Sequence, residues 1–94
     1  MKLENLRIIV DDREQKSGIP DLLKSVGMGV EMKTLLIGDY IVAPETIVER
    51  KSIKDLMASI FDGRLYDQCN RLKENFEHPI ILVEGNVDEI EEIT

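Results

Sequence analysis

Residues 38 to 55 constrain the fold more than any other stretch of this 94-residue chain, because they join a hairpin pattern to a dense set of charges. The stretch is GDYIVAPETIVERKSIKD. Two short apolar runs, at 40–43 and 46–48, flank Pro44-Glu45. This pattern predicts a β-hairpin with its turn at the Pro-Glu pair.

The charged residues at the ends of this hairpin suit a cation site. Asp39 precedes the first run, and Glu49, Arg50 and Lys51 follow the second. Alternate residues of a strand share a face, so Glu49 and Lys51 are expected to point one way and Arg50 the other. Carboxylate oxygens and several waters hold Mg²⁺, and a lysine can orient an attacking water or stabilise charge. The alternative is that these charges are merely solvated at the strand ends.

The register of the hairpin decides whether Asp39 can join that site. A two-residue turn pairs Ala43 with Thr46 and would set Asp39 opposite Arg50, on the wrong face. A three-residue loop or a β-bulge would set Asp39 opposite Lys51 instead. Bulges are common beside active sites because they re-aim a side chain. We therefore expect an odd register or a bulge here.

The rest of the chain predicts an α/β fold with a mixed sheet. Apolar spacing and punctuation by Gly and Pro set the expected elements. In chain order these are a strand at 6–10 that ends at Asp11, a loop at 15–18, a helix at 19–26, a strand at 30–37, the hairpin, helices at 53–60 and 65–76, and a strand at 79–84. The last strand is a near-continuous apolar run, which favours a buried central position.

Several polar residues have a plain structural interpretation. Ser52 and Asp55 fit a capping box, which we favour for Asp55 over direct metal contact. Arg71 is interpreted as part of a solvated helix face, and Glu84 as a surface residue. His78, directly before a proline, is assigned to a loop without a catalytic role.

Length and composition limit the kinds of protein that this chain can be. The chain is long enough for one domain, 1–94, with one core. The single cysteine, Cys69, cannot form an internal disulfide and is interpreted as a small buried residue in a reducing compartment. No apolar run approaches the length that a membrane span needs, and the start lacks a signal-peptide core. We expect an intracellular protein, in the cytoplasm of a microbe or in the nucleus of a eukaryote.

The net charge of −7 argues against indiscriminate binding of nucleic acid. The charge is unevenly distributed, since acids gather after position 83 and half of the basic residues lie between Arg50 and Lys73. Any DNA-facing surface is therefore expected between Arg50 and Lys73.

These motifs together resemble the nuclease domain of the XPF/Hef family of structure-specific DNA endonucleases. The family signature is Gly-Asp, a gap, and Glu-Arg-Lys-X-X-X-Asp. It stands here as GD at 38–39, a nine-residue gap, and ERKSIKD at 49–55. The match extends to DDRE at 11–14 and SIFDGRLYDQ at 59–68.

The resemblance implies a restriction-endonuclease-like fold, a variant of the PD-(D/E)XK nucleases, with a mixed sheet flanked by helices. It implies Mg²⁺- or Mn²⁺-dependent phosphodiester hydrolysis near flaps and forks in DNA repair or replication-fork processing. Asp11, Asp39 and Glu49 match the acidic metal-site residues, and Arg50 would lend a backbone carbonyl to the metal. Lys51 matches the catalytic lysine.

Five further positions match the active site by resemblance. Asp55 matches a catalytic aspartate, while Arg13, Glu14, Arg64 and Gln68 are expected to support the site or contact phosphate. Family members work on branched DNA as homodimers or heterodimers through this domain. Family domains also continue past the last strand, so the resemblance implies that C-terminal elements are missing here.

Two other functions stay open at the level of sequence. One is a non-catalytic dimerisation or DNA-binding module of the same fold. The other is a different nuclease of this broad fold, such as a junction resolvase or restriction enzyme. The Glu-Arg-Lys form of the motif and the Gly63-Arg64-Leu65 segment argue against the latter.

Overall fold

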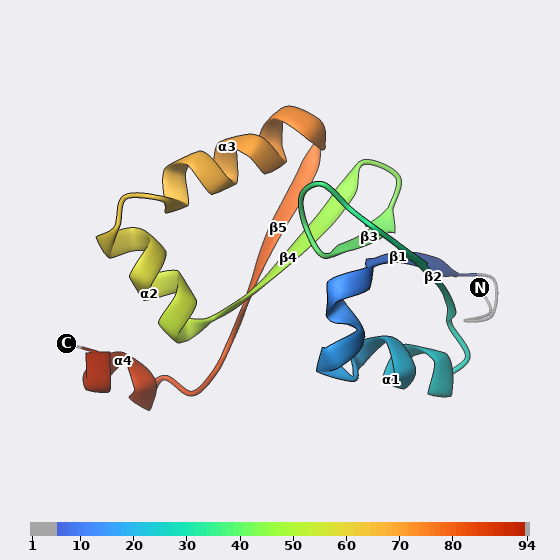
Figure 1. Ribbon diagram of the computed structural model, residues 1–94, viewed down its shortest axis with the longest axis horizontal. Helices are drawn as coiled ribbons and strands as arrows, with labels where there is room; N and C mark the ends of the chain where they lie inside the picture. The colour runs from blue at the N-terminus through green and yellow to red at the C-terminus, as the bar shows by residue number, and fades with distance from the viewer. Residues whose placement is uncertain (1–5, 94) are drawn as a thin grey trace.

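The computed structural model describes residues 6–93 and gives an alternation of strands and helices (Figure 1). The elements are β1 (Arg7–Asp11), a 3₁₀ helix η2 (Asp12–Ser17), α1 (Ile19–Ser25), β2 (Gly29–Lys33), β3 (Tyr40–Ala43), β4 (Thr46–Ser52), α2 (Ile53–Phe61), α3 (Leu65–Asn75), β5 (His78–Glu84) and α4 (Asp88–Ile93). Within this described part, none of the helices is long and apolar enough to cross a membrane.

The five strands form one mixed sheet in the order β2-β1-β3-β4-β5. The outer pairs, β1–β2 and β4–β5, are parallel, and the two pairings that involve β3 are antiparallel. Helix α1 connects the first parallel pair, while α2 and α3 connect the second. The expected mixed sheet with flanking helices is therefore confirmed.

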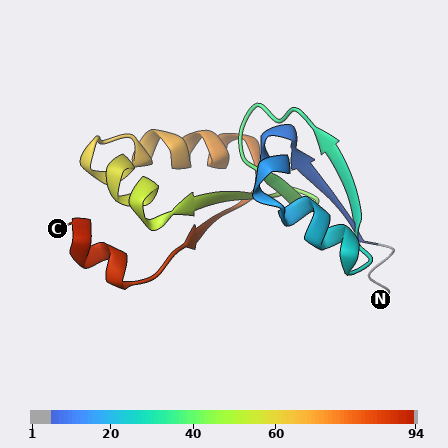
Figure 2. The same ribbon diagram turned by 60° about the horizontal axis from the view of Figure 1, so that its bottom comes forward.

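The helices divide between the two ends of the molecule (Figures 1 and 2). Helix α1 lies beside β1 and β2, where Ile19 and Leu23 pack on a core of Ile8, Val10 and Tyr40. Helices α2 and α3 lie together over the β4–β5 pair at the other end. The polar residues that end β1 and β4 therefore come to lie where these two halves meet.

The hairpin contains the expected bulge. Ala43 pairs with Thr46 across the predicted two-residue turn, but Tyr40 pairs with Val48, so the register shifts within β3. If this register continues, Asp39 stands opposite Glu49. The expectation that Asp39 lies opposite Lys51 was therefore wrong by two residues. The extra residue lies in β3 rather than in the turn.

Strand β5 corrects a second expectation. The apolar run at 79–84 favoured a buried central strand, whereas β5 lies at the edge of the sheet beside β4. Ile80, Leu82 and Val83 are 42–48% exposed. An unbroken apolar run indicates that both faces can be buried, but the neighbours of the strand decide whether they are.

Two segments near β1 also differ from expectation. Strand β2 ends at Lys33, so residues 34–37 form a loop rather than the second half of a strand. The segment after Asp11 is the helix η2, where a loop was expected. Local hydrogen bonds explain the helix, since Asp11 caps its start by accepting from the backbone N–H of Arg13.

Candidate active site

A cleft of about 320 Å³ opens where β1, β4 and α3 meet. Three acids, two arginines and one amide line it together with apolar and backbone groups. The lining residues are Asp11, Arg13, Leu36, Ile37, Gly38, Asp39, Glu49, Gln68, Arg71 and Leu72. Residues from four separate stretches of the sequence thus share one cleft.

Asp39 is fixed by its backbone between two strands. Its N–H donates to the carbonyl of Val48 at 2.9 Å, and its carbonyl accepts from the N–H of Asp11 at 2.9 Å. Its carboxylate accepts a hydrogen bond from the backbone N–H of Arg50 at 2.7 Å. The bulge therefore places Asp39 in the same cleft as Glu49 and leaves its second oxygen, Oδ1, without a hydrogen bond among the described residues.

The carboxyls of Asp39 and Glu49 both have raised pKa values. Burial is the main cause for each. The negative charge of Asp39 raises the pKa of Glu49 further, and the charges of Glu14 and Asp11 do the same for Asp39. In residues 6–93 no hydrogen bond or ion pair reaches the Glu49 carboxylate. A bound cation would relieve this repulsion directly.

Asp11 is buried, with 1% of its surface exposed. Its Oδ2 accepts from the Nε of Arg13 at 2.7 Å, and its Oδ1 accepts from the N–H of Leu35 at 2.8 Å. The hydrogen bond from Arg13 is the main reason that its pKa is lowered. Both oxygens are therefore engaged by the protein itself, unlike those of Glu49.

No group of three His, Cys, Asp or Glu side chains in the described part of the chain stands close enough to hold a metal ion. The candidate residues for holding a cation are Asp39 and Glu49, whose carboxylates line the same cleft. Mg²⁺ suits such a pair, since it commonly takes one or two carboxylates and keeps several waters.

Lys51 and Asp55 lie next to this cleft rather than in its lining. They line a neighbouring hollow with Arg50, Ser52 and Glu84, among others. The charge of Lys51 lowers the pKa of Glu49, so the ammonium group lies within electrostatic reach of that carboxylate. The N–H of Asp55 donates to the Oγ of Ser52 at 3.0 Å, so the predicted cap at the start of α2 is confirmed.

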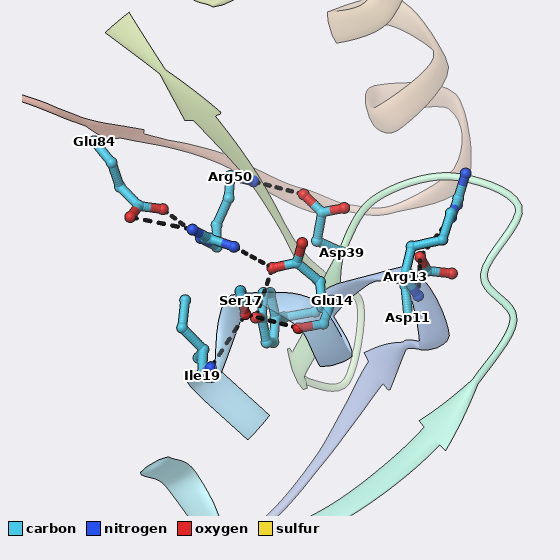
Figure 3. Close-up of polar contacts among 9 residues, drawn as sticks. Asp11, Arg13, Glu14, Ser17, Ile19, Asp39, Arg50 and Glu84 are labelled. Atoms are coloured by element: carbon cyan, nitrogen blue, oxygen red, sulfur yellow. Dashed lines mark hydrogen bonds and ion pairs between the residues drawn. The ribbon is translucent and has the colours of Figure 1, made fainter. Parts of the chain in front are cut away.

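The side chain of Arg50 points away from the cleft and joins three elements (Figure 3). It donates to Glu14 of η2 at 2.5 Å and forms an ion pair with Glu84 of β5. The hydroxyl of Tyr40 donates to the same Glu14 oxygen at 2.6 Å. Burial, followed by this hydrogen bond, raises the pKa of Tyr40 to about 12. Glu84, interpreted from sequence as a surface residue, thus helps to fix the strand that carries Glu49.

The two site residues predicted at the start of α3, Arg64 and Gln68, lie in different surroundings. Arg64 pairs with Asp62 at 3.1 Å in an exposed turn outside the cleft lining. Gln68 lines the cleft, and its Oε1 is buried without a hydrogen-bond partner among the described side chains.

Arg71 and Leu36 also line the cleft, although neither was assigned to it from the sequence. Arg71 was interpreted as part of a solvated helix face, and it is exposed as expected. Arg71 follows Gln68 by three residues on α3, and this spacing puts both on one helix face. That signal was present in the sequence. Leu36 gave no signal, because its place in the cleft depends on how the loop after β2 folds back.

Comparison with known proteins agrees with this geometry. The sequence pattern of the ERCC4 domain matches residues 10–93. The "3′-flap repair endonuclease Xpf" of Saccharolobus solfataricus is 48% identical over 89 residues, which cover 95% of this chain and 38% of that protein. Mouse "DNA repair endonuclease XPF" is 46% identical over 77 residues, covering 82% of this chain and 8% of that protein.

A solved structure, "XPF from Aeropyrum pernix, complex with DNA", superimposes with a TM-score of 0.81 at 46% identity. The match covers 87% of this chain and 41% of that one, so the chain spans about two-fifths of these archaeal relatives. The expected XPF-like nuclease fold is confirmed. Its cleft, its motifs and these matches show that the chain belongs to the ERCC4-domain family.

Proposed function

We propose that this chain is the nuclease part of a divalent-metal-dependent endonuclease that hydrolyses a phosphodiester near branch points in DNA. The observation that carries the proposal is the pair Asp39 and Glu49, two half-buried carboxylates with raised pKa values in one cleft with Arg13 and Arg71. The XPF relatives named above are repair endonucleases, and the Aeropyrum pernix structure is a complex with DNA.

Mg²⁺ or Mn²⁺ fits the donor set of this cleft. Among the carboxylate oxygens that the described residues bring to the cleft, those of Glu49 and the Oδ1 of Asp39 have no partner, and we assign both groups to the cation. The backbone carbonyl of Arg50 is a third candidate oxygen. A bound cation would lower the pKa of a water and stabilise the charge that develops on the phosphate.

Residues around Asp39 and Glu49 are assigned the other steps of binding and catalysis. Lys51 follows Glu49 by two residues on β4 and is near enough to lower its pKa, and we assign it to orient the attacking water or to stabilise negative charge. Arg13 is 74% exposed although its Nε holds Asp11, so its outer edge can contact a phosphate. Arg71 offers a second guanidinium from α3, on which the described residues place no polar partner. Asp11 keeps Arg13 and the loop at Leu35 in place.

Association with another chain of this fold is part of the proposal. The edge strand β5 leaves Ile80, Leu82 and Val83 partly exposed, and apolar area of this kind favours association. A non-catalytic dimerisation or DNA-binding module remains the competing function. The engagement of both Asp11 oxygens by Arg13 and Leu35 favours it, because the described residues bring no third carboxylate with an unengaged oxygen to the cleft.

Cleavage of an end-labelled 3′-flap duplex tests the proposal. Wild type is compared with Glu49→Gln, Lys51→Ala and the matched control Lys54→Ala, which changes an exposed lysine in the first turn of α2. With Mn²⁺, wild type and the control should cut near the branch, and EDTA should stop both. Glu49→Gln and Lys51→Ala should each lose about 100-fold or more in rate.

Two outcomes would change the assignment. Full activity of Glu49→Gln would exclude this cleft as the catalytic site. Binding of the flap by wild type without cleavage under any of these conditions would favour the non-catalytic module. Fork and four-way-junction substrates of the same sequence distinguish a flap endonuclease from a junction resolvase.

A further inference from the structure

Leu36 is the most exposed large hydrophobic side chain in the described part of the chain, at 97%. It lies in the loop between β2 and β3 and lines the cleft that holds Asp39 and Glu49. A single exposed leucine on a protein surface needs no explanation in general. This one combines full exposure with a place at the rim of the proposed catalytic cleft.

The loop that carries Leu36 is fastened on both sides. The N–H of Leu35 donates to Asp11 at 2.8 Å, and the carbonyl of Leu35 accepts from Arg13 at 3.1 Å. The hydroxyl of Thr34 donates to Asp12 at 2.7 Å. On the other side Gly38 is buried against Ile47, with no room for a Cβ. The backbone on either side of Leu36 is thus held, and its side chain projects from a fixed frame.

The side chains that line the cleft beside Leu36 indicate which class of ligand it would bind. Arg13 and Arg71 suit phosphate groups, so a nucleic acid strand in the cleft would run past Leu36. In a continuous duplex the bases are stacked and present no apolar face to such a side chain. An unstacked base at a branch does present one, and aliphatic side chains that insert at base steps use this contact.

From this arrangement we infer that Leu36 packs against the unstacked base beside the scissile phosphate and thereby favours branched over continuous DNA. The inference rests on the proposed function, and it assigns the recognition of the branch within this chain to one side chain. Leu36 makes no contribution to the buried core, so its removal leaves the fold intact.

The test uses a 3′-flap duplex with 2-aminopurine at the branch, and a nicked, fully paired duplex of the same sequence. Wild type is compared with Leu36→Ala, with Leu36→Met, which keeps an apolar contact, and with Leu22→Ala. Leu22 is 65% exposed on α1, away from the cleft, and serves as the matched control. Fluorescence is read in EDTA, where no cleavage is expected, and cleavage rates are read with Mn²⁺.

Wild type, Leu36→Met and Leu22→Ala should raise the 2-aminopurine fluorescence, and Leu36→Ala should not. The ratio of flap to nicked-duplex cleavage should fall about tenfold in Leu36→Ala alone. An unchanged ratio and an unchanged fluorescence response in Leu36→Ala would overturn the inference, as would an equal loss on both substrates. Wild type that changes the fluorescence but cleaves neither substrate would refute the nuclease function while supporting the contact.

Discussion

Replacement of Gly38 by alanine tests the geometry that delivers Asp39 to the cleft. Gly38 has φ +76°, and a Cβ built there would stand 2.3 Å from the Cγ1 and 2.5 Å from the Cδ1 of Ile47. Ile47 is fully buried, so it has no free space into which to move. Two costs therefore add, one from the left-handed backbone and one from the collision.

The two costs can be separated with a matched glycine. The left-handed conformation costs a residue with a Cβ about 1–2 kcal/mol. Overpacking a filled core costs about 1–3 kcal/mol more. Gly63 has nearly the same conformation, with φ +74°, but a Cβ added there would meet no atom of the described residues within 4 Å. Gly63→Ala should thus show the first cost alone.

Urea unfolding of Gly38→Ala, Gly63→Ala and wild type measures the difference. With a slope of about 1 kcal/mol per molar urea, the midpoint of Gly38→Ala should lie about 1–3 M below that of Gly63→Ala. In the background Ile47→Val, which lacks the Cδ1 atom, Gly38→Ala should cost less. Equal midpoints for the two glycine variants would refute the argument that close packing at Gly38 sets the position of Asp39.

Three further changes follow from the site. Glu49→Gln removes a carboxylate that burial and the charge of Asp39 disfavour. It should raise the free energy of unfolding at neutral pH by up to about 1 kcal/mol, a figure that already allows for solvent screening. The raised pKa means that the folded wild type binds the proton of Glu49 more tightly than the unfolded chain does, so wild-type stability falls as pH rises from 4.5 through the raised pKa. In urea unfolding, the advantage of Glu49→Gln over wild type should therefore vanish below that pH window. Ser52→Ala should cost about 1 kcal/mol in thermal unfolding by removing the cap from the N–H of Asp55, and an unchanged midpoint would contradict the cap. For Tyr40, whose pKa is raised to about 12, stability should fall as pH rises above 10.0, and Tyr40→Phe should flatten this decline in urea unfolding between about pH 9 and about pH 11.

Local patterns in the sequence predicted the elements well. The apolar spacing of the helices and the turn at Pro44-Glu45 were sufficient, because both depend on residues close together in the chain. The bulge was expected because chemistry required Asp39 on the face of Glu49. Its place within β3 was not, since nothing in the alternation at 40–43 marks an extra residue.

Long-range packing explains what the sequence did not predict. The edge position of β5 depends on which strand lies beside it, and its apolar run carries no such information. Glu14 accepts from Tyr40, 26 positions away, and from Arg50, 36 positions away, while Arg50 also reaches Glu84 across 34 positions. Arg50 itself was predicted to point away from the face of Glu49, and it does, but there it holds the strand in place.

The affinity for Mn²⁺ tests most directly whether the bulge creates a cation site from Asp39 and Glu49. Isothermal titration of wild type, Asp39→Asn, Glu49→Gln and the control Glu45→Gln, an exposed acid in the hairpin turn, gives the comparison. We predict one bound Mn²⁺ per wild-type chain, unchanged affinity in Glu45→Gln, and a loss of about tenfold or more in each cleft variant. Equal Mn²⁺ affinity in all four proteins would contradict the account.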